Sequence, residues 1–246
     1  MFETMQPVKI WLSAPGPNGW KPLIYLEELG VPYEVVNLPF SELIGDEFRK
    51  VNPNGKIPVM EDPNTGIRIW ESGAIILYII EQFGQPQLKE FHLARQWLVY
   101  QVAQQGPYYG QLGWFSWLHP EQLPSAVERY QKQALRIMKV LDDALAEIDP
   151  SSEGDHWLVG GKCTYADLSY VMYHVVIDVQ AKTAEGSMLK QFPHLEAWHA
   201  KMLERPSVAK VVQMRLDAMA REGFTVDEES LRAKADEMLA KEAERA

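Results

Sequence analysis

The chain has 246 residues, of which 46% are apolar and 24% charged, a composition typical of globular proteins and unlike that of disordered or fibrous chains. Its 24 Lys and Arg against 34 Asp and Glu give a net charge of −10, which argues against a nucleic-acid partner because such binding needs a basic surface. The single cysteine, Cys163, cannot form an internal disulfide, so we expect a reduced, cytoplasmic protein. No secretory signal is evident, and the longest apolar run, 74–80, is far short of the ~20 residues of a membrane helix, so we expect no membrane association.

Residues 8–84 alternate short β-rich runs with helical runs. Leu23, Leu26 and Leu29 recur at helical spacing and Gly30 follows them as a C-cap would, which predicts a helix there. The same criteria give strand 8–12, helix 21–29, strand 33–38, a short helix 47–51, strands 57–60 and 67–70, and helix 72–83. The order β-α-β-α-β-β-α predicts a compact α/β unit with its own core.

Beyond Gly84 the pattern becomes helical, with hardly any strand signal. The apolar periods predict helices over 91–117, 124–148, 165–180, 192–204, 207–221 and 227–244. Gly106, Pro107 and Gly110 predict a break or kink in the first of these. A short polar linker containing a proline lies at 84–88, so we predict two domains, residues 1–84 and residues 89–246.

The segment Pro17 to Lys21 is a turn that leads from the first strand into the first helix. Asn18 has two interpretations at this position. It caps the helix, as Asn commonly does, or its amide donates to an anion such as a thiolate bound over the positive end of the helix.

Two further segments carry polar groups at strand ends. In Asn52 to Val59 a proline interrupts a strand-like run, so Pro58 lies at a strand start or in a tight turn; a cis bond there would leave the backbone of Ile57 free to pair with an extended peptide. In Trp70 to Ala74, Ser72 is a good helix N-cap and Glu71 can receive an ammonium group. Taken singly, each segment has an ordinary structural interpretation.

The second half contains a folding motif and no metal motif. Cys163 to Leu168 has the form of a capping box, with Thr164 as the cap and Asp167 reaching back to it, so we interpret Cys163 as structural. The histidines lack metal-ligand spacing, and His174 reads as a satisfied helix residue, so we expect no metal site.

Taken jointly, these segments resemble the glutathione transferase family over nearly the whole chain. Ser13 to Lys21, Asn52 to Pro58 and Glu71-Ser72 follow the family's order and spacing, and Cys163 to Leu168 resembles its helix-six capping box. The resemblance implies a thioredoxin-like α/β N-terminal domain followed by an all-α C-terminal domain. Pro17-Asn-Gly with Lys21, and Ser125 to Tyr130, resemble the fungal branch related to the yeast nitrogen-regulation prion protein and the bacterial nu class. The stretches from Asn18 to Pro32 and from Leu118 to Pro124 resemble transferases of fungal toxin biosynthesis.

The resemblance implies roles residue by residue. Asn18 matches the amide that holds the glutathione sulfur, Ile57 and Pro58 match the pair that binds the cysteinyl unit, and Glu71 and Ser72 match the γ-glutamyl site. Lys56 lies where a basic side chain approaches glutathione.

The chain also departs from the family pattern. No Tyr or Cys follows the first strand, so neither the tyrosine nor the cysteine mechanism applies, and Gly16 replaces a common Thr, which leaves Ser13 as the nearest hydroxyl and second catalytic candidate. Leu43 stands near the position where relatives direct His or Gln toward the glycyl carboxylate, so Lys56 is left to bind that end.

The aromatic cluster 104–117 is explained in part by helix packing and a dimer interface. Because the acceptor pocket of the family faces this region, Tyr108, Tyr109 and Trp114, together with Pro15, are candidates for its wall, and a broad apolar acceptor is expected.

The resulting prediction is a homodimeric glutathione transferase, active in detoxification or secondary metabolism, that conjugates the glutathione thiol to a hydrophobic electrophile. Three alternatives stay open. They are a glutathione-dependent disulfide reductase, a conjugating or isomerising enzyme of fungal secondary metabolism, and a regulatory module that binds glutathione without turnover. Glutathione is the co-substrate, and no metal is expected.

Overall fold

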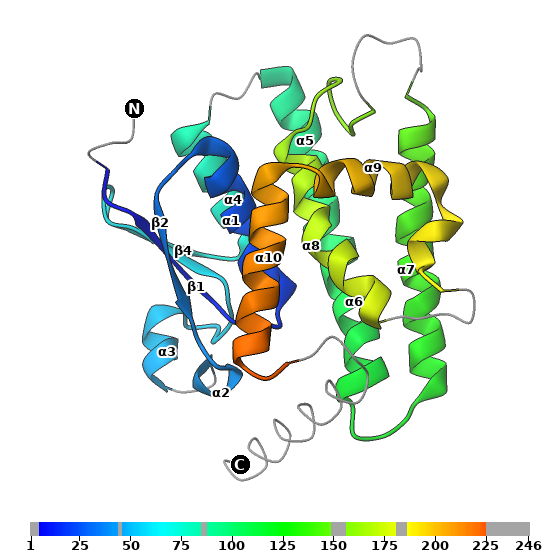
Figure 1. Cartoon of the computed structure of the whole chain (residues 1–246), viewed down its shortest axis with the longest axis horizontal. Coiled ribbons are helices and arrows are strands. Elements are labelled where there is room, and N and C mark those ends of the chain that lie inside the picture. The colour runs from blue at the N-terminus through cyan, green and yellow to red at the C-terminus, as the bar shows by residue number, and fades with distance from the viewer. Residues whose placement is uncertain (1–4, 44–45, 85–87, 149–155, 181–185, 225–246) are drawn as a thin grey trace. The chain divides into compact units, whose positions relative to one another are not determined.

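The computed structural model describes residues 5–43, 46–84, 88–148, 156–180 and 186–224 (Figure 1). The predicted tail helix 227–244 lies outside this part of the chain. The chain separates into two compact units, and within the described residues the first unit comprises 5–84 and 206–224 and the second 88–205.

The first unit contains a four-stranded mixed sheet and the predicted α/β order, with one further short helix, residues 40–43, that the sequence pattern did not predict. Its elements are β1 (Val8–Leu12), α1 (Pro17–Leu29), β2 (Tyr33–Asn37), α2 (Phe40–Leu43), α3 (Asp46–Val51), β3 (Val59–Asp62), β4 (Ile67–Trp70) and α4 (Ser72–Phe83). The sheet order is β2-β1-β3-β4, with β1 parallel to β2 and the other two pairs antiparallel. Helices α1 and α4 pack against each other and against the sheet (Figure 1). The predicted thioredoxin-like half is therefore confirmed.

Close approach of α1 to β1 depends on one small residue. A Cβ built on Gly19 would lie 2.5 Å from the Cβ of Leu12, a distance that side chains do not tolerate. Leu12, Leu23, Ile24 and Leu26 in these two elements are completely buried. Gly19 thus lets the first turn of α1 lie directly over the end of β1.

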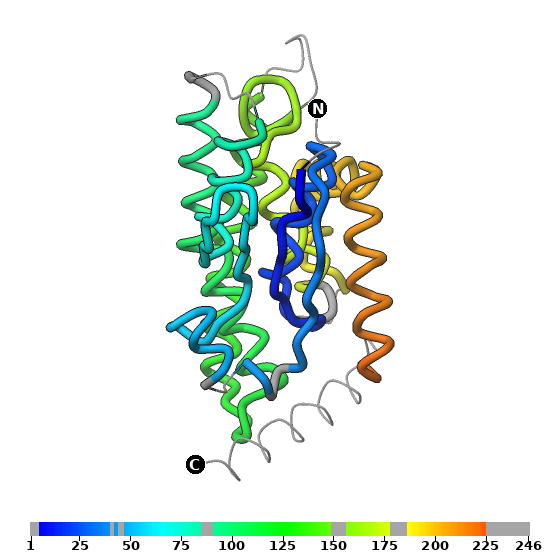
Figure 2. Tube along the Cα trace, turned by 90° about the vertical axis from the view of Figure 1, so that its left-hand side faces the viewer, coloured from blue at the N-terminus to red at the C-terminus, as the bar shows by residue number. Residues whose placement is uncertain are grey.

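The last described helix, α10 (Pro206–Arg221), groups by its contacts with the first unit. It packs along α1, and in Figure 2 it is the orange helix beside the N-terminal elements drawn in blue. The chain therefore leaves the first unit after α4 and returns to it at Pro206. The sequence pattern predicted this helix but gave no indication of what it packs against.

The second unit is helical, as predicted. It contains α5 (Leu88–Tyr100), η1 (Gln101–Gln105), α6 (Gly106–Gly113), η2 (Trp114–Leu118), α7 (Pro124–Ala146), α8 (Tyr165–Gln180), η3 (Met188–Gln191) and α9 (Pro193–Leu203). The main packing pairs are α6 with α7, α7 with α9, and α5 with α8.

The predicted break near Pro107 takes the form of π turns. Gln105 and Gly106 keep right-handed helical dihedrals, and the π segments η1 and η2 flank α6. Proline removes one i→i−4 hydrogen bond, and a wider π turn next to it absorbs the mismatch without ending the helix. The run from Leu88 to Leu118 is thus helical throughout.

The capping box at the start of α8 is confirmed. The carboxylate of Asp167 accepts hydrogen bonds from the Thr164 backbone N–H at 2.8 Å and the Thr164 hydroxyl at 2.9 Å, while Thr164 Oγ1 accepts from the Ala166 N–H at 3.2 Å. The second carboxylate oxygen of Asp167 accepts from the Leu158 N–H at 2.9 Å and from Trp198 Nε1 at 3.0 Å. This one side chain ties α8 to α9 and to the preceding turn.

Candidate functional site

The three segments singled out from the sequence, residues 13–21, 52–59 and 70–74, meet where β1 and β4 end and β3 begins. Val59 is paired with both Trp11 and Trp70, so the end of β1, the start of β3 and the end of β4 lie next to one another. The side chain of Ile57 reaches the loop after β1, since a Cβ built on Gly16 would lie 3.4 Å from its Cδ1. Strand pairing, rather than sequence distance, brings these segments together.

The loop from Ser13 to Gly16 is fixed through two consecutive carbonyl groups. The carbonyl of Ala14 accepts a hydrogen bond from Trp20 Nε1 at 3.0 Å, and that of Pro15 accepts one from Arg215 Nη2 at 3.0 Å. Ser13 is only 2% exposed, and its Oγ has no hydrogen-bond partner among the residues that the structure describes. Because a buried hydroxyl without a partner costs about 1–3 kcal/mol, it is a candidate ligand-binding group.

Helix α1 begins four residues earlier than predicted, which changes the interpretation of Asn18. Gly16 is the N-cap, Pro17 is the first helical residue, and Asn18 is the second. Proline favours this first position because its φ is preset for a helix and its missing N–H is not needed there. The interpretation of Asn18 as the helix cap is therefore wrong, and the N-cap residue, a glycine, has no side chain with which to cap the helix.

A lysine lies buried one turn after Asn18. Lys21 is 1% exposed, and burial lowers its pKa to about 7, an effect that the negative charge of Glu71 partly opposes. Glu71 itself is exposed at the start of α4. The sequence showed Lys21 only as a branch-like residue, since its burial depends on contacts that local patterns do not reveal.

The loop before β3 is organised by a buried asparagine. Asn52 is 1% exposed; its side-chain Oδ1 accepts from the Asn54 N–H at 2.9 Å, and its side-chain Nδ2 donates to the carbonyl of Lys56 at 2.5 Å. The peptide bond between Ile57 and Pro58 is cis. From the sequence, Asn52 was only the end of a helix, whereas in the structure it shapes the segment that presents Lys56 and Ile57.

The turn between β4 and α4 has an unusual backbone. Glu71 has φ 72° and ψ 118° and occupies the N-cap position of α4 without a side-chain cap bond. A non-glycine residue in such a region costs of order 1–3 kcal/mol, and such strain is commonly found at functional sites. Ser72 is the first helical residue, buried to 7% exposure, so its interpretation as the N-cap is wrong.

Leu43 is a packing residue. It is 4% exposed and forms a small core with Phe48 and Val59, against which Trp11, Leu38, Val51 and Ile57 pack. Apolar packing thus fixes the corner between α2 and α3, where the branch resemblance led us to look for a polar side chain.

The aromatic candidates of the second unit differ in exposure. Tyr109 is completely buried, with its ring 6.1 Å from that of Tyr173 and 6.2 Å from that of His174. Tyr108 is partly exposed, and Trp114 is 36% exposed. Packing in the helical core accounts for the ring of Tyr109, whereas the other two reach the surface.

The buried histidines of the second unit pack with aromatic rings. His174 and His199 have ring centroids 5.3 Å apart, and His174 also lies against Tyr109, Tyr170 and Trp198. Burial holds the pKa of His174 well below its ordinary value, and the nearby His199 lowers it further. Among the described residues no three His, Cys, Asp or Glu side chains are placed to hold a metal ion, and no described helix has the length and apolarity to cross a membrane.

Comparison with protein families matches both halves of the chain. Residues 6–81 match the model of the glutathione S-transferase N-terminal domain, and residues 114–215 match that of the glutathione S-transferase C-terminal domain. Glutathione S-transferase-like protein gedE of Aspergillus terreus is 41% identical over 220 residues, which cover 86% of this chain and 96% of the relative.

Solved structures agree with this result. Glutathione transferase URE2P8 of Phanerochaete chrysosporium, determined with oxidized glutathione, superimposes with a TM-score of 0.80 at 36% identity, covering 89% of this chain and 99% of the other. Ure2p5 of the same fungus, cocrystallized with 1-(S-glutathionyl)-2,4-dinitrobenzene, gives a TM-score of 0.77 at 34% identity, with coverages of 87% and 97%. Yeast URE2 proteins are also among the relatives, so the predicted branch is confirmed.

Proposed function

Because this chain belongs to the glutathione S-transferase family, we propose that it is a glutathione transferase that conjugates the thiol of glutathione to a hydrophobic electrophile in the cytoplasm. The observation that carries the proposal is the meeting of Ser13, the uncapped start of α1, Ile57–Pro58 and Glu71–Ser72 at one sheet edge. In the conjugation the sulfur forms a bond to carbon, the leaving group departs with its electron pair, and the thiol proton passes to solvent.

Thiolate stabilisation is assigned to Asn18 and Ser13. A free thiol has a pKa near 8.5, so only a few per cent is ionised at neutral pH. The start of α1 has no side-chain cap, its first N–H groups carry the positive end of the helix dipole, and the Asn18 amide belongs to its first turn. Together with the unpartnered Ser13 hydroxyl, these donors suffice for a depression of about one to two units, each about 1.4 kcal/mol.

The remaining contacts are assigned to the cysteinyl, γ-glutamyl and glycyl parts of glutathione. The backbone of Ile57, before cis-Pro58, pairs with the cysteinyl unit; Glu71 receives the γ-glutamyl ammonium; Ser72 and the first turn of α4 receive its carboxylate. Lys56 is exposed on a loop shaped by Asn52, which supports its assignment to the glycyl carboxylate.

The acceptor pocket is assigned to Pro15, Tyr108, Tyr109 and Trp114. The exposure of Trp114 and Tyr108 supports a direct part in acceptor binding, whereas Tyr109 is completely buried against Tyr173 and His174. A structure with a bulky glutathione conjugate tests this assignment: the adduct should lie between residues 14–18 and these aromatic rings. Rings turned away from the sulfur would remove the substrate proposal and leave the glutathione site standing.

Disulfide reduction is the second candidate, because URE2P8 was crystallised with oxidized glutathione. Assays with a chlorinated nitrobenzene, a hydroxyethyl disulfide and a hydroperoxide separate the activities. Turnover of the first supports conjugation, and turnover of the second alone supports reduction. Tight glutathione binding without any turnover would replace both with a regulatory binding module. Activity confined to a biosynthetic precursor would instead point to secondary metabolism.

We also propose a homodimer of two-fold symmetry, as the family resemblance implies. Ile67 and Trp70 on the edge strand β4 are 41% and 38% exposed, and Leu93 and Val99 on α5 are 47% and 56% exposed, which supports an apolar interface on each unit. Sedimentation at micromolar concentration should give twice the 28.1 kDa of one chain. A monomer would remove this proposal without touching the glutathione site.

A further inference from the structure

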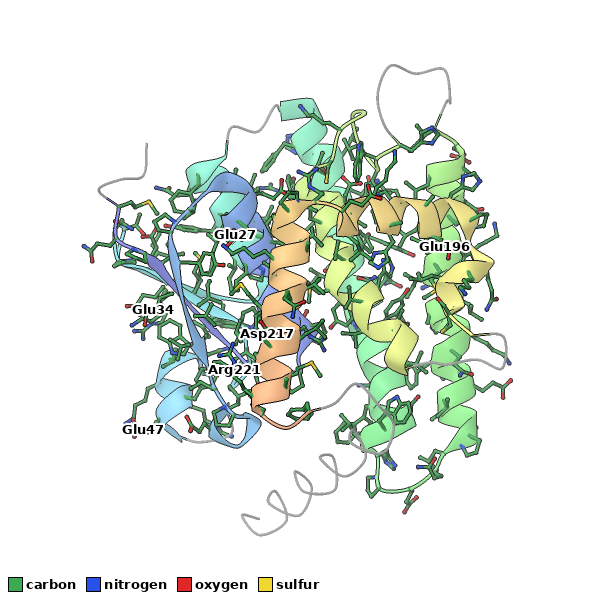
Figure 3. All side chains as sticks on the ribbon, viewed as in Figure 1. Glu27, Glu34, Glu47, Glu196, Asp217 and Arg221 are labelled. Atoms are coloured by element: carbon green, nitrogen blue, oxygen red, sulfur yellow. The ribbon has the colours of Figure 1, made fainter. Side chains whose placement is uncertain are left out.

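Helix α10 is fixed to the first unit by polar contacts along its whole length. Lys210 Nζ lies 2.6 Å from Glu27 Oε1 of α1, and Ser207 donates to Glu28. Toward its other end, the Asn37 amide donates to Glu222 Oε1 at 2.6 Å. Figure 3 shows Glu27 on the blue helix α1 and Asp217 and Arg221 on α10 beside it. A side chain in the middle of α10 is therefore held in a defined place relative to α1.

Arg215 is that side chain, and it is buried with no carboxylate partner among the residues that the structure describes. It is 6% exposed, its Nη2 donates to the Pro15 carbonyl at 3.0 Å, and its Nε has no partner among the described residues. Burial also lowers its pKa to about 10. Removing a guanidinium from water costs several kcal/mol unless strong partners compensate. Packing alone would be served better by an apolar residue, so the charge and its donors need another explanation.

The acceptor of this hydrogen bond has a special place in the chain. Pro15 C=O belongs to the peptide unit that joins Pro15 to Gly16, and Gly16 is the N-cap of α1. The preceding carbonyl, of Ala14, is held by Trp20. With both carbonyls anchored, the orientation of two successive peptide planes is fixed, and with it the direction in which Ser13 and the first turn of α1 present their donors.

We propose that Arg215 is a positioning residue of the thiol site: by holding the Pro15 carbonyl from α10, it fixes the 13–16 loop and aligns the donors of Ser13 and Asn18 with the glutathione sulfur. This inference rests on the proposed function. Arg215 does not touch the sulfur in this account. Its buried positive charge also adds to the positive potential at the start of α1, in the same sense as the helix dipole.

The test compares Arg215→Met and Arg215→Lys with Lys210→Met in the full chain. The Lys210 variant removes a cation and a contact of the same helix without reaching the loop, so it controls for loosening of α10. Thiolate absorbance of bound glutathione is titrated against pH, and kcat and KM for glutathione are measured with a chlorinated nitrobenzene. We expect Arg215→Met to raise the apparent thiol pKa by about half to one unit, which leaves about three- to tenfold less thiolate at neutral pH. The kcat should fall in proportion, with KM for glutathione changed less than twofold.

Arg215→Lys should recover part of the loss, because an ammonium group can still donate to a carbonyl, and Lys210→Met should leave the thiol pKa unchanged. An Arg215→Met protein with unaltered thiol pKa and lowered thermal stability would reduce Arg215 to a structural residue and overturn the inference. If Arg215→Met does not fold, the lysine variant decides. A thiol pKa that is raised by up to one unit, with kcat lowered in proportion, supports positioning. A wild-type thiol pKa with wild-type kcat overturns it. Failure of the unmodified protein to depress the thiol pKa at all would overturn the proposed function, and this inference with it.

Discussion

The helix starts in the two units differ in how their first N–H groups are satisfied. At the start of α8 in the helical unit, Thr164 and Asp167 satisfy one another and the neighbouring N–H groups. In the α/β unit, the N-cap residues of α1 and α4 are Gly16 and Glu71, and neither makes a side-chain cap bond. A capped start is complete without a ligand, whereas an uncapped start at a sheet edge offers its donors to one.

The capped and uncapped helix starts also differ in their contribution to the stability of the fold. The α8 corner gathers several hydrogen bonds on one buried carboxylate and stabilises the fold. The α1 and α4 corners carry an unpartnered Ser13 hydroxyl and a strained Glu71 backbone, both of which oppose folding. A ligand that pairs with these groups would offset the local loss of stability. The α8 corner therefore has the properties of a site that stabilises the fold, and the α1 and α4 corners have those of a binding site.

The largest effect is expected from removing the capped corner. Asp167→Ala loses the acceptor of the Leu158, Thr164 and Trp198 donors and leaves them buried without partners, so the free energy of unfolding should fall by about 3–5 kcal/mol. Urea denaturation measures this loss. Asp217→Ala is the control: this exposed carboxylate of α10 accepts only from Gln213 among the described residues, and its loss should cost no more than about 0.5 kcal/mol. Equal losses in the two variants would refute the role given to the α8 corner.

Asn18→Ala should have the reverse profile at the uncapped corner. Turnover should fall about ten- to a hundredfold, in line with the loss of one charge-assisted donor, while stability stays nearly constant because Asn18 does not cap the helix. Initial rates together with urea curves check both statements. An apparent thiol pKa that does not change in this variant would transfer the main donor role to Ser13.

A pH-dependent change in stability, modest within any one pH unit, is expected from Lys21. Its folded-state pKa of about 7 lies below the ordinary 10.5, so between these values the unfolded chain binds a proton that the folded protein lacks. Stability should therefore rise with pH from about 7 toward 10, by at most about 1.4 kcal/mol per pH unit. Lys21→Met should lose this rise, and Lys50→Met, a change at an exposed lysine, should keep it. Parallel pH dependences in the wild type and Lys21→Met would contradict the burial of a titrating lysine under the site.

The smallest effect is expected from Ser13→Ala. The variant removes a buried hydroxyl that has no partner in the described structure, so the protein should become equally or slightly more stable. Turnover should fall less than in Asn18→Ala, by less than about tenfold. Comparing the two variants in one thiolate titration ranks the donors, and a larger loss for Ser13→Ala would reverse the ranking proposed above.

Sequence patterns predicted the features that depend on near neighbours. The order of strands and helices followed from apolar periodicity, and the Thr164–Asp167 box from its three-residue spacing. The candidate site residues followed from motifs whose order resembles that of a known family. The element order and the capping box depend on contacts within a few residues, which a sequence displays directly, whereas the site residues came from the resemblance alone.

Contacts between distant segments explain what was missed. The start of α1 was placed at Lys21 because Gly19 and Pro17 read as turn formers, whereas the close packing on Leu12 requires a glycine inside the helix. Asn52 and Lys21 owe their roles to burial, and Arg215 meets Pro15 across 200 positions of the chain. No local pattern records such a contact, because it arises only when α10 folds back onto α1.

The return of α10 to the first unit bears on how the chain is made. Synthesis proceeds from the N-terminus, so the sheet, α1 and α4 leave the ribosome long before residues 206–224 that complete their unit. Until α10 emerges, the face of α1 that it covers remains open, and the 13–16 loop lacks its anchor from Arg215. The thiol site should therefore mature only after residues 206–224 have been released.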